Sequence, residues 1–206
     1  MTKIFSHQEI AAFDNHYRKN FINSLPGLKP VNLIGTADKH NQTNLAIFAS
    51  VHHIGANPPL MGFIMRPVTV ERHTWQNIEQ TESFTINSVT QSMYKQAHQT
   101  AARYPREVSE FEATGLEPWY SESGKAPYVA DSPVKIGLEL EETLDIKANG
   151  TKLIIGRVIE VVVDEKLLTQ DGNINFAKAD AVTVSGLDSY YSNAFLEKLP
   201  YAKPNR

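Results

Sequence analysis

The chain contains no cysteine, and this absence excludes disulfide bonds, thiolate catalysis and cysteine-ligated metal centres. A chain without disulfides suits a reducing compartment. No apolar run approaches the roughly 20 residues that span a bilayer. The first residues, Met1 to His7, also lack the apolar stretch of a secretory signal. We therefore expect a soluble, cytoplasmic protein without a membrane partner.

The common nucleotide and hydrolase motifs are also missing. No two of the 11 glycines stand two residues apart, so the GxGxxG fingerprint is absent, and there is no GxxxxGK[ST] loop. HExxH and GxSxG do not occur either. His52 and His53 are adjacent, and adjacent side chains of a strand point to opposite faces of a sheet. These absences argue against a Rossmann domain, a P-loop and a serine hydrolase, and we expect no metal site.

Charge is neither strongly acidic nor strongly basic, with a net value of -3. Proteins that bind nucleic acid usually carry a basic surface, so we expect no nucleic-acid partner. The hydrophobic share of 41% and the charged share of 21% are those of an ordinary globular protein. A length of 206 residues fits one domain, 1–206, better than two.

Apolar segments of strand length dominate the pattern. The stretch 134–145 alternates apolar and polar residues, which indicates one buried and one wet face. Asn149-Gly150 is a strong hairpin-turn signal before the next apolar stretch. Because strands follow one another as hairpins with few helices between them, we predict a mainly β fold with peripheral helices, an antiparallel barrel. The predicted strands lie within residues 31–51 (a hairpin), 60–65, 84–87, 134–145, 151–163 and 181–184.

Four helical segments are predicted around these strands. Ser6 and Glu9 fit a capping box, so one short helix should follow and carry Ile10, Phe13 and Tyr17 on one face. The other helical segments are one from Thr74, one over 88–104, and one turn around 107–111.

Three polar groups stand just beyond or between apolar segments. Residues 44–50 contain small side chains, against which a flat ring such as a flavin could lie, although Ala46 and Ala49 could equally relieve crowding in a barrel. Arg66 and residues 72–78 form the second group. Thr74 would stand at or near a helix N-terminus with Arg72 beside it, which is a phosphate site by simple electrostatics or else an ordinary capped helix. The third group, 98–103, could equally be a solvated helix face.

Taken in order, these segments resemble the flavin reductase-like family with its FMN-binding split β-barrel. The match runs from about residue 25 to about residue 190, with N- and C-terminal extensions outside it. Each motif alone is weak, but their order and spacing together are specific. The matching segments are 30–34 with 43–50, Pro58–Phe63, Thr74–Ile78, Phe84–Asn87, Glu110–Leu116, and Ile155–Val158 followed by Asp164.

The resemblance implies a homodimer with FMN near the subunit interface. It places the ring and ribityl chain along Asn44 to Ser50 and the phosphate near Arg72, Thr74 and Asn77, with Asn87 and the Thr100 region close by. Ala101 stands where relatives would have a hydroxyl, and Arg157 is expected to pair structurally on a strand. The expected cofactor-binding residues are Asn44, Leu45, Ala46, Ile47, Ser50, Arg72, Thr74, Asn77, Asn87 and Thr100.

The activity implied is hydride transfer from NAD(P)H to flavin, which needs stacking and exclusion of water more than a general base. We therefore expect an NAD(P)H:flavin oxidoreductase, and the sequence identifies no catalytic residue for it. Such an enzyme could supply reduced flavin to a partner monooxygenase component. A non-catalytic FMN carrier or electron-transfer protein is the alternative, and a pyridoxamine-phosphate-oxidase-like enzyme is a third. No residue that would read the nicotinamide ribose is identifiable, so NADH and NADPH stay open.

Overall fold

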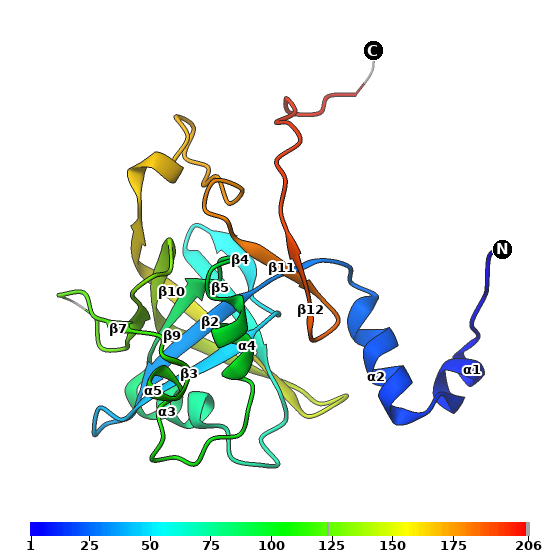
Figure 1. Ribbon diagram of the computed structural model, residues 1–206, viewed down its shortest axis with the longest axis horizontal. Helices are drawn as coiled ribbons and strands as arrows, with labels where there is room; N and C mark the ends of the chain where they lie inside the picture. The colour runs from blue at the N-terminus through cyan, green and yellow to red at the C-terminus, as the bar shows by residue number, and fades with distance from the viewer. Residues whose placement is uncertain (123, 205–206) are drawn as a thin grey trace.

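The computed structural model describes residues 1–122 and 124–204, and its centre is a seven-stranded sheet in which every neighbouring pair is antiparallel. The strand order is β3-β2-β6-β9-β10-β5-β4, which confirms the predicted mainly β, antiparallel fold (Figure 1). The strands of this sheet are β2 (Asn32–Ala37), β3 (Thr43–Phe48), β4 (His52–Ala56), β5 (Pro59–Met65), β6 (Ser83–Ser88), β9 (Val134–Ile146) and β10 (Thr151–Val163).

Two smaller sheets accompany the large one. The first has the order β1-β11-β12, and the second pairs β7 with β8. Strands β4 and β12 were not expected from the sequence, because His52-His53 and Ser189–Ser192 carry no apolar run. The strands of the small sheets are β1 (Lys29–Pro30), β7 (Pro118–Trp119), β8 (Tyr128–Val129), β11 (Val182–Ser185) and β12 (Ser189–Ser192).

The long β9–β10 hairpin forms where the turn chemistry predicts it. Gly150 adopts a φ of 72°, which a residue with a side chain rarely tolerates. The Asn149 side chain accepts a hydrogen bond of 3.1 Å from the Thr151 amide and so closes the turn. The loop is longer than two residues, because the last paired residues are Ile146 and Thr151.

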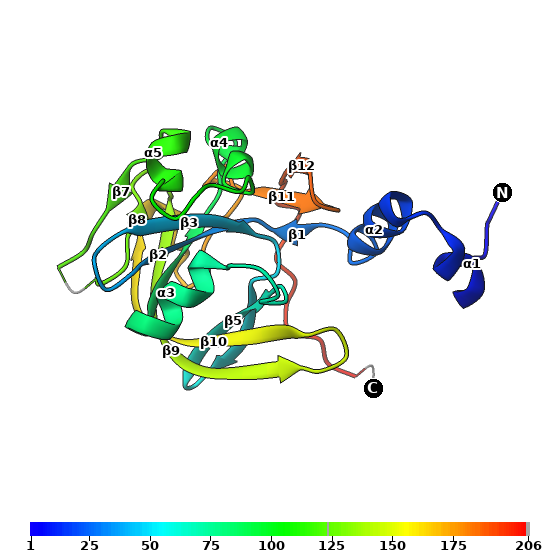
Figure 2. The ribbon, with the colours of Figure 1, turned by 90° about the horizontal axis from the view of Figure 1, so that it is seen from below.

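Strand β2 is buried on both faces and separates two hydrophobic clusters. Leu33 belongs to a cluster under α4 (Tyr94–Gln99) and α5 (Glu110–Thr114), whereas its neighbour Ile34 belongs to a cluster that includes Ile78 of α3 (His73–Thr81). Figure 2 shows α4 and α5 on one side of β2 and β3, and α3 on the other. Alternation along the strand thus supplies both layers of the core.

The interior of the barrel is so closely packed that there is no room for even a methyl side chain at position 156. A Cβ atom there would lie 2.5 Å from Cζ of Phe84 and 3.0 Å from Cβ of Leu138, both fully buried side chains. The pairing of β10 with β9 shifts register at this glycine. A glycine is therefore needed where β10 crosses the core.

The N-terminal segment forms two helices instead of the single one expected. Helix α1 (His7–Ala12) starts at the predicted capping box of Ser6, and α2 (Asn15–Ser24) starts at Asp14, whose carboxylate accepts from the amides of residues 16 and 17. Neither helix has a buried residue, and both extend away from the sheets (Figures 1 and 2). In residues 1–122 and 124–204 we find no helix with the length and apolar character needed to cross a bilayer.

Two other helices are shorter than, or displaced from, their predictions. The helix expected over 88–104 is confined to α4, because Thr90 forms a bridge with Ala181 and keeps the preceding segment extended. The Thr100 hydroxyl donates to the Ala97 carbonyl at 2.8 Å at the end of α4. The turn expected around 107–111 begins later, at Glu110. Sequence periodicity alone could not locate these ends, since one of them depends on a partner about 90 residues away.

Candidate functional site

A cavity of about 910 Å³ opens beside the free edge of β3. This volume lies within the range of small-molecule sites. Its walls come from residues 44–50, from 64–74, from 98–104 with Glu110, and from α2 facing the β11–β12 turn.

Strand β3 offers backbone groups to this cavity because it pairs on one side only. The Leu45 amide points away from β2 and donates to the Glu110 carboxylate at 2.9 Å. In an antiparallel strand alternate residues face the same side, so the amide and carbonyl of Ile47 also point outward. Within the described residues no hydrogen bond to these two groups is found. Ile47 therefore presents one free donor and one free acceptor to the cavity.

The segment 106–110 covers the first half of the β3 edge and stops at Leu45. The Gln42 side chain donates to the Glu107 carbonyl at 3.4 Å, and the hydroxyls of Thr43 and Ser109 share a hydrogen bond of 2.6 Å. The bond from Leu45 to Glu110 ends this series. The chain thus protects the edge up to Leu45 and leaves the rest to the cavity.

Ser50 fastens the turn after β3 to strand β5. Its hydroxyl accepts from the Ile64 amide at 3.1 Å and donates to the Ile64 carbonyl at 3.3 Å. Strands β3 and β5 are not neighbours in the sheet. One side chain therefore holds together the two segments that border the cavity at this corner.

Helix α3 begins at the cavity wall without a capping side chain. Arg72 occupies the N-cap position and makes no side-chain cap hydrogen bond. Thr74, the second helical residue, accepts a hydrogen bond of 3.0 Å from the Asn44 side chain. The first amides of an α-helix have no partner within the helix, and here no side chain substitutes. Among the described residues the N-terminus of α3 thus has no side-chain cap, unlike the ordinary capped helix that the sequence left open beside a phosphate site.

Three arginines, Arg66, Arg72 and Arg103, line the same cavity. Burial lowers the pKa of Arg72, and the positive charges of the other two lower it further. Its Nε donates to the Pro67 carbonyl at 3.4 Å, and among the described residues none of the three forms an ion pair with a carboxylate. Like charges that converge without a counter-charge attract an anionic ligand.

Burial also shifts the pKa values of Glu110 and His73 at the cavity. Burial raises the pKa of Glu110 above its ordinary value, against the lowering effect of its hydrogen bonds and of Arg106. Burial lowers the pKa of His73, and Arg106 lowers it further, while Glu71 opposes this at 3.9 Å. Both shifts favour the neutral form of the side chain.

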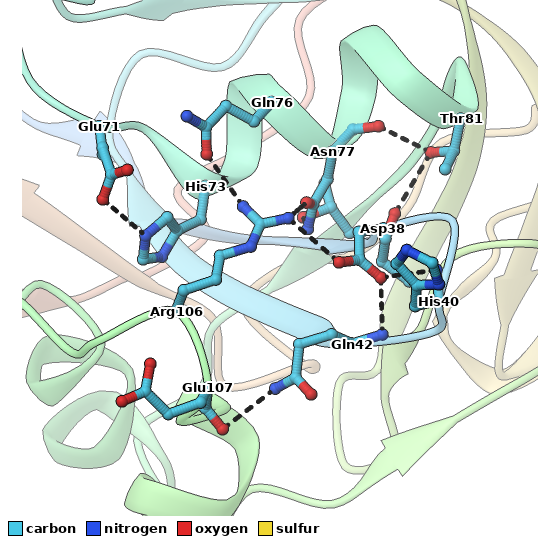
Figure 3. A network of polar contacts seen from close by, with 12 residues as sticks. Asp38, His40, Gln42, Glu71, His73, Gln76, Asn77, Thr81, Arg106 and Glu107 are labelled. Atoms are coloured by element: carbon cyan, nitrogen blue, oxygen red, sulfur yellow. Dashed lines mark hydrogen bonds and ion pairs between the residues drawn. The ribbon is translucent and has the colours of Figure 1, made fainter.

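Behind the cavity wall, Arg106 is the centre of a polar network (Figure 3). Its guanidinium donates to the side chains of Gln76 at 3.0 Å, Asn77 at 2.6 Å and Asp38 at 3.3 Å. Arg106 itself does not line the cavity.

The other end of the cavity is lined by α2 and the β11–β12 hairpin. His98 Nδ1 and the Tyr190 hydroxyl share a hydrogen bond of 2.9 Å, and Tyr190 also contacts the ring of Tyr94. Lys29 donates to the carbonyls of Asn23 at 2.9 Å and Gly186 at 3.0 Å. Tyr190 thus contributes to this wall.

The structure brings seven of the ten expected cofactor-binding residues to one cavity and places three elsewhere. The Leu45 side chain lies in the core. Asn77 is buried and bonded to Thr36 and Arg106. Asn87 is fully buried, and its side chain donates to the Leu33 carbonyl and accepts from the Val129 amide. The seven that line the cavity are Asn44, Ala46, Ile47, Ser50, Arg72, Thr74 and Thr100.

Other residues of the site were not selected from the sequence. Arg66 and Arg103 stood inside the polar groups that the sequence indicates, so they could have been found there. Glu110 and Arg106 carried no local signal, because their partners lie far away in the sequence. Arg157, expected to pair structurally, does so with Glu141 through two bonds of 2.8 Å.

Comparison with known proteins shows the family and the fold. The model of the flavin reductase like domain family matches residues 28–178. A crystal structure from Shewanella frigidimarina NCIMB 400, assigned as a flavin reductase with a split barrel domain, has a TM-score of 0.94 and 49% identity over 98% of this chain and 100% of that one. The flavoredoxin of Desulfovibrio vulgaris (Miyazaki F) has a TM-score of 0.73 and 25% identity over 85% of this chain and 92% of that one. Nitrilotriacetate monooxygenase component B from Bacillus cereus shares the fold, with a TM-score of 0.82 and 22% identity over 97% and 98% of the two chains.

Proposed function

Because the chain belongs to the flavin reductase-like family, we propose that it binds FMN in the cavity beside β3 and reduces it with NAD(P)H. One observation carries this proposal. The same 910 Å³ cavity is bordered by the uncovered edge of β3, the N-terminus of α3 and three arginines that form no ion pair within residues 1–122 and 124–204.

The residues present fit a flavin. A flavin ring is flat, with hydrogen-bond donors and acceptors along one edge and an apolar edge opposite. The outward amide and carbonyl of Ile47 match the polar edge, and Ala46 and Ala49 leave room for a flat ring against the strand. Asn44 would hold Thr74 in place behind the ligand.

The residues also fit a phosphate. Arg66, Arg72 and Arg103 supply guanidinium donors, and the first turn of α3 supplies amides and the positive end of the helix dipole. The cavity lining holds five Lys or Arg and three Asp or Glu, in a chain whose net charge is -3. This local excess of positive charge would concentrate anionic nucleotides at the site.

When bound, FMN supplies the chemistry of hydride acceptance and release. The part of the chain is to bind, orient and exclude water. The carboxyl of Glu110 is committed to the Leu45 amide. We therefore assign no general acid or base.

Two finer points belong to this proposal. We infer a homodimer with the flavin near the subunit interface and, for the reduced flavin, a monooxygenase component as acceptor. The likeness in fold to a monooxygenase component B supports the second point. The flavoredoxin neighbour favours the alternative function, a flavoprotein that passes electrons without turning over NAD(P)H itself.

Anaerobic titration tests the proposal directly. Purified protein is mixed with FMN, and the visible flavin spectrum is followed while NADH or NADPH is added. Bleaching on the timescale of turnover is the expected result. A bound flavin that both donors leave oxidised would favour the electron-transfer alternative. No bound flavin would refute the proposal, and oxidation of pyridoxamine phosphate would indicate the third activity.

A further inference from the structure

Arg106 joins three segments that are distant in the sequence (Figure 3). Its guanidinium bonds to Gln76 and Asn77 of α3 and to Asp38 in the turn between β2 and β3, while its own backbone belongs to the loop after α4. A planar guanidinium can hold several acceptors at fixed angles, which a lysine cannot do.

The acceptors of Arg106 are themselves held by the barrel. Asn77 is 1% exposed, and its amide group donates to the Thr36 hydroxyl of β2 at 3.1 Å. Asp38 accepts from the amides of His40 at 2.8 Å and Gln42 at 3.0 Å. Burial would raise the pKa of Asp38, but the hydrogen bonds from these two amides and from Arg106 lower it below its ordinary value. A fixed acceptor and a fixed anion thus face the guanidinium.

The segments joined in this way are the two walls of the anion site. Arg103 lines the cavity three residues before Arg106, on the loop after α4. Arg72 and Thr74 line it from the start of α3, one turn before Gln76. The Arg103 loop and the start of α3 are about 30 residues apart in the sequence. Side-chain hydrogen bonds of Arg106 connect them.

We propose that Arg106 is a positioning residue for the phosphate of FMN. It sets the distance between the Arg103 loop and the N-terminus of α3 without touching the ligand, because it lies outside the cavity. This inference rests on the proposed function. Without the guanidinium, the buried oxygen of Asn77 would lose its donor, Asp38 would keep only the His40 and Gln42 amides, and the loop would separate from α3. A binding site whose donors are already in place loses less entropy on binding.

A comparison of FMN with riboflavin tests this role, because the two ligands differ only in the phosphate. The variants are Arg106→Met and Arg106→Lys. Arg157→Met is the matched control, because it removes a two-bond arginine pair that does not line the cavity. Dissociation constants come from flavin fluorescence well below the melting temperature of each variant. We expect Arg106→Met to weaken FMN binding about tenfold or more and riboflavin binding by about twofold at most. Arg106→Lys should restore part of the loss, and the control should change neither constant.

Each other outcome has a definite meaning. Equal losses for both ligands, or no loss for FMN, would overturn the positioning role. If Arg106→Met does not fold, the Lys variant and Asp38→Asn decide in its place, with a loss that must again be specific to FMN. A wild-type protein that binds neither ligand refutes the proposed function as well. A wild-type protein that prefers FMN, beside an Arg106→Met variant that keeps this preference, refutes the Arg106 inference alone.

Discussion

Glu110 gives the sharpest test of how the free edge of β3 is organised. Glu110 is 6% exposed, and its carboxylate accepts a hydrogen bond of 2.9 Å from the Leu45 amide. Leu45 itself is fully buried. In Glu110→Ala this amide loses its acceptor in a place that water reaches poorly. An unsatisfied buried donor costs about 1–3 kcal/mol of stability. For a chain of this size each kcal/mol lowers the melting temperature by about 2–4 °C, so we expect a fall of about 2–12 °C.

Glu110→Gln separates the charge of this residue from its hydrogen bond. The amide oxygen still accepts from Leu45, but the side chain no longer ionises. Burial raises the pKa of Glu110 in the folded protein, so between its ordinary value and the raised value the folded state binds more protons than the unfolded state. The contribution of Glu110 to stability must therefore fall as the pH rises through this window. Gln has no such dependence, and the variant should gain stability relative to wild type as the pH rises.

Urea unfolding at a series of pH values between about 4 and 7 measures this difference. Glu112→Gln is the matched control, because Glu112 lies on the same helix and is exposed. We expect the stability difference between Glu110→Gln and wild type to grow with pH, and the control difference to stay nearly constant. A difference that is flat, or that shrinks as the pH rises, would refute the assignment of a burial-raised pKa to Glu110.

Three further predictions follow from single contacts. Gly156→Ala places a methyl group 2.5 Å from Phe84 and should cost about 1–3 kcal/mol in thermal unfolding. Arg157→Ala, at the exposed neighbouring position, should leave the melting temperature nearly unchanged, and equal losses for the two variants would contradict the close contact at Gly156. Ser50→Ala removes both hydrogen bonds to Ile64 and should lower stability by about 1–3 kcal/mol. An unchanged melting temperature would show that the contact between the turn after β3 and strand β5 does not depend on these bonds. Arg72→Met should weaken FMN binding about tenfold or more at low salt and less at high salt, measured by titration calorimetry, and a loss that is independent of salt would argue against a phosphate contact.

The strands were predictable because their signals are local. The alternation along β9, the Asn149-Gly150 turn and the apolar run of β5 each act over a few residues, and each predicts an element that forms in the structure. The single buried face expected along β9 is confined to its first part, because full burial ends at Leu138 and Leu144 is 45% exposed. The start of α3 is equally local, since Arg72 and Thr74 mark it directly. The start of α4 was not predictable, because the bridge between Thr90 and Ala181 keeps the segment before Tyr94 out of the helix.

The site was only half predictable for the same reason. A strand presents its backbone and its small side chains in sequence order, so residues 44–50 could be selected as a group. Arg106 and Glu110 contact positions 29 to 68 residues away, and no spacing in the sequence indicates such a contact. Asn87 is the opposite case, a residue that was expected at the site and lies outside the cavity. The family resemblance placed Asn87 close to the ligand, but its side chain bonds to the backbone of two other strands.

The position of the cavity follows from how much of the β3 edge is covered by other parts of the chain. An unpaired strand edge can add a foreign strand, and proteins normally cover it. Here the segment 106–110 covers β3 as far as Leu45, and the same segment carries Arg106, which ties it to α3. Beyond Leu45 the edge stays open and borders the cavity. Segment 106–110 therefore determines where a ligand can pair with β3, and it also sets the distance between the Arg103 loop and α3. The ring contacts and the phosphate contacts of the proposed FMN site thus depend on the same segment.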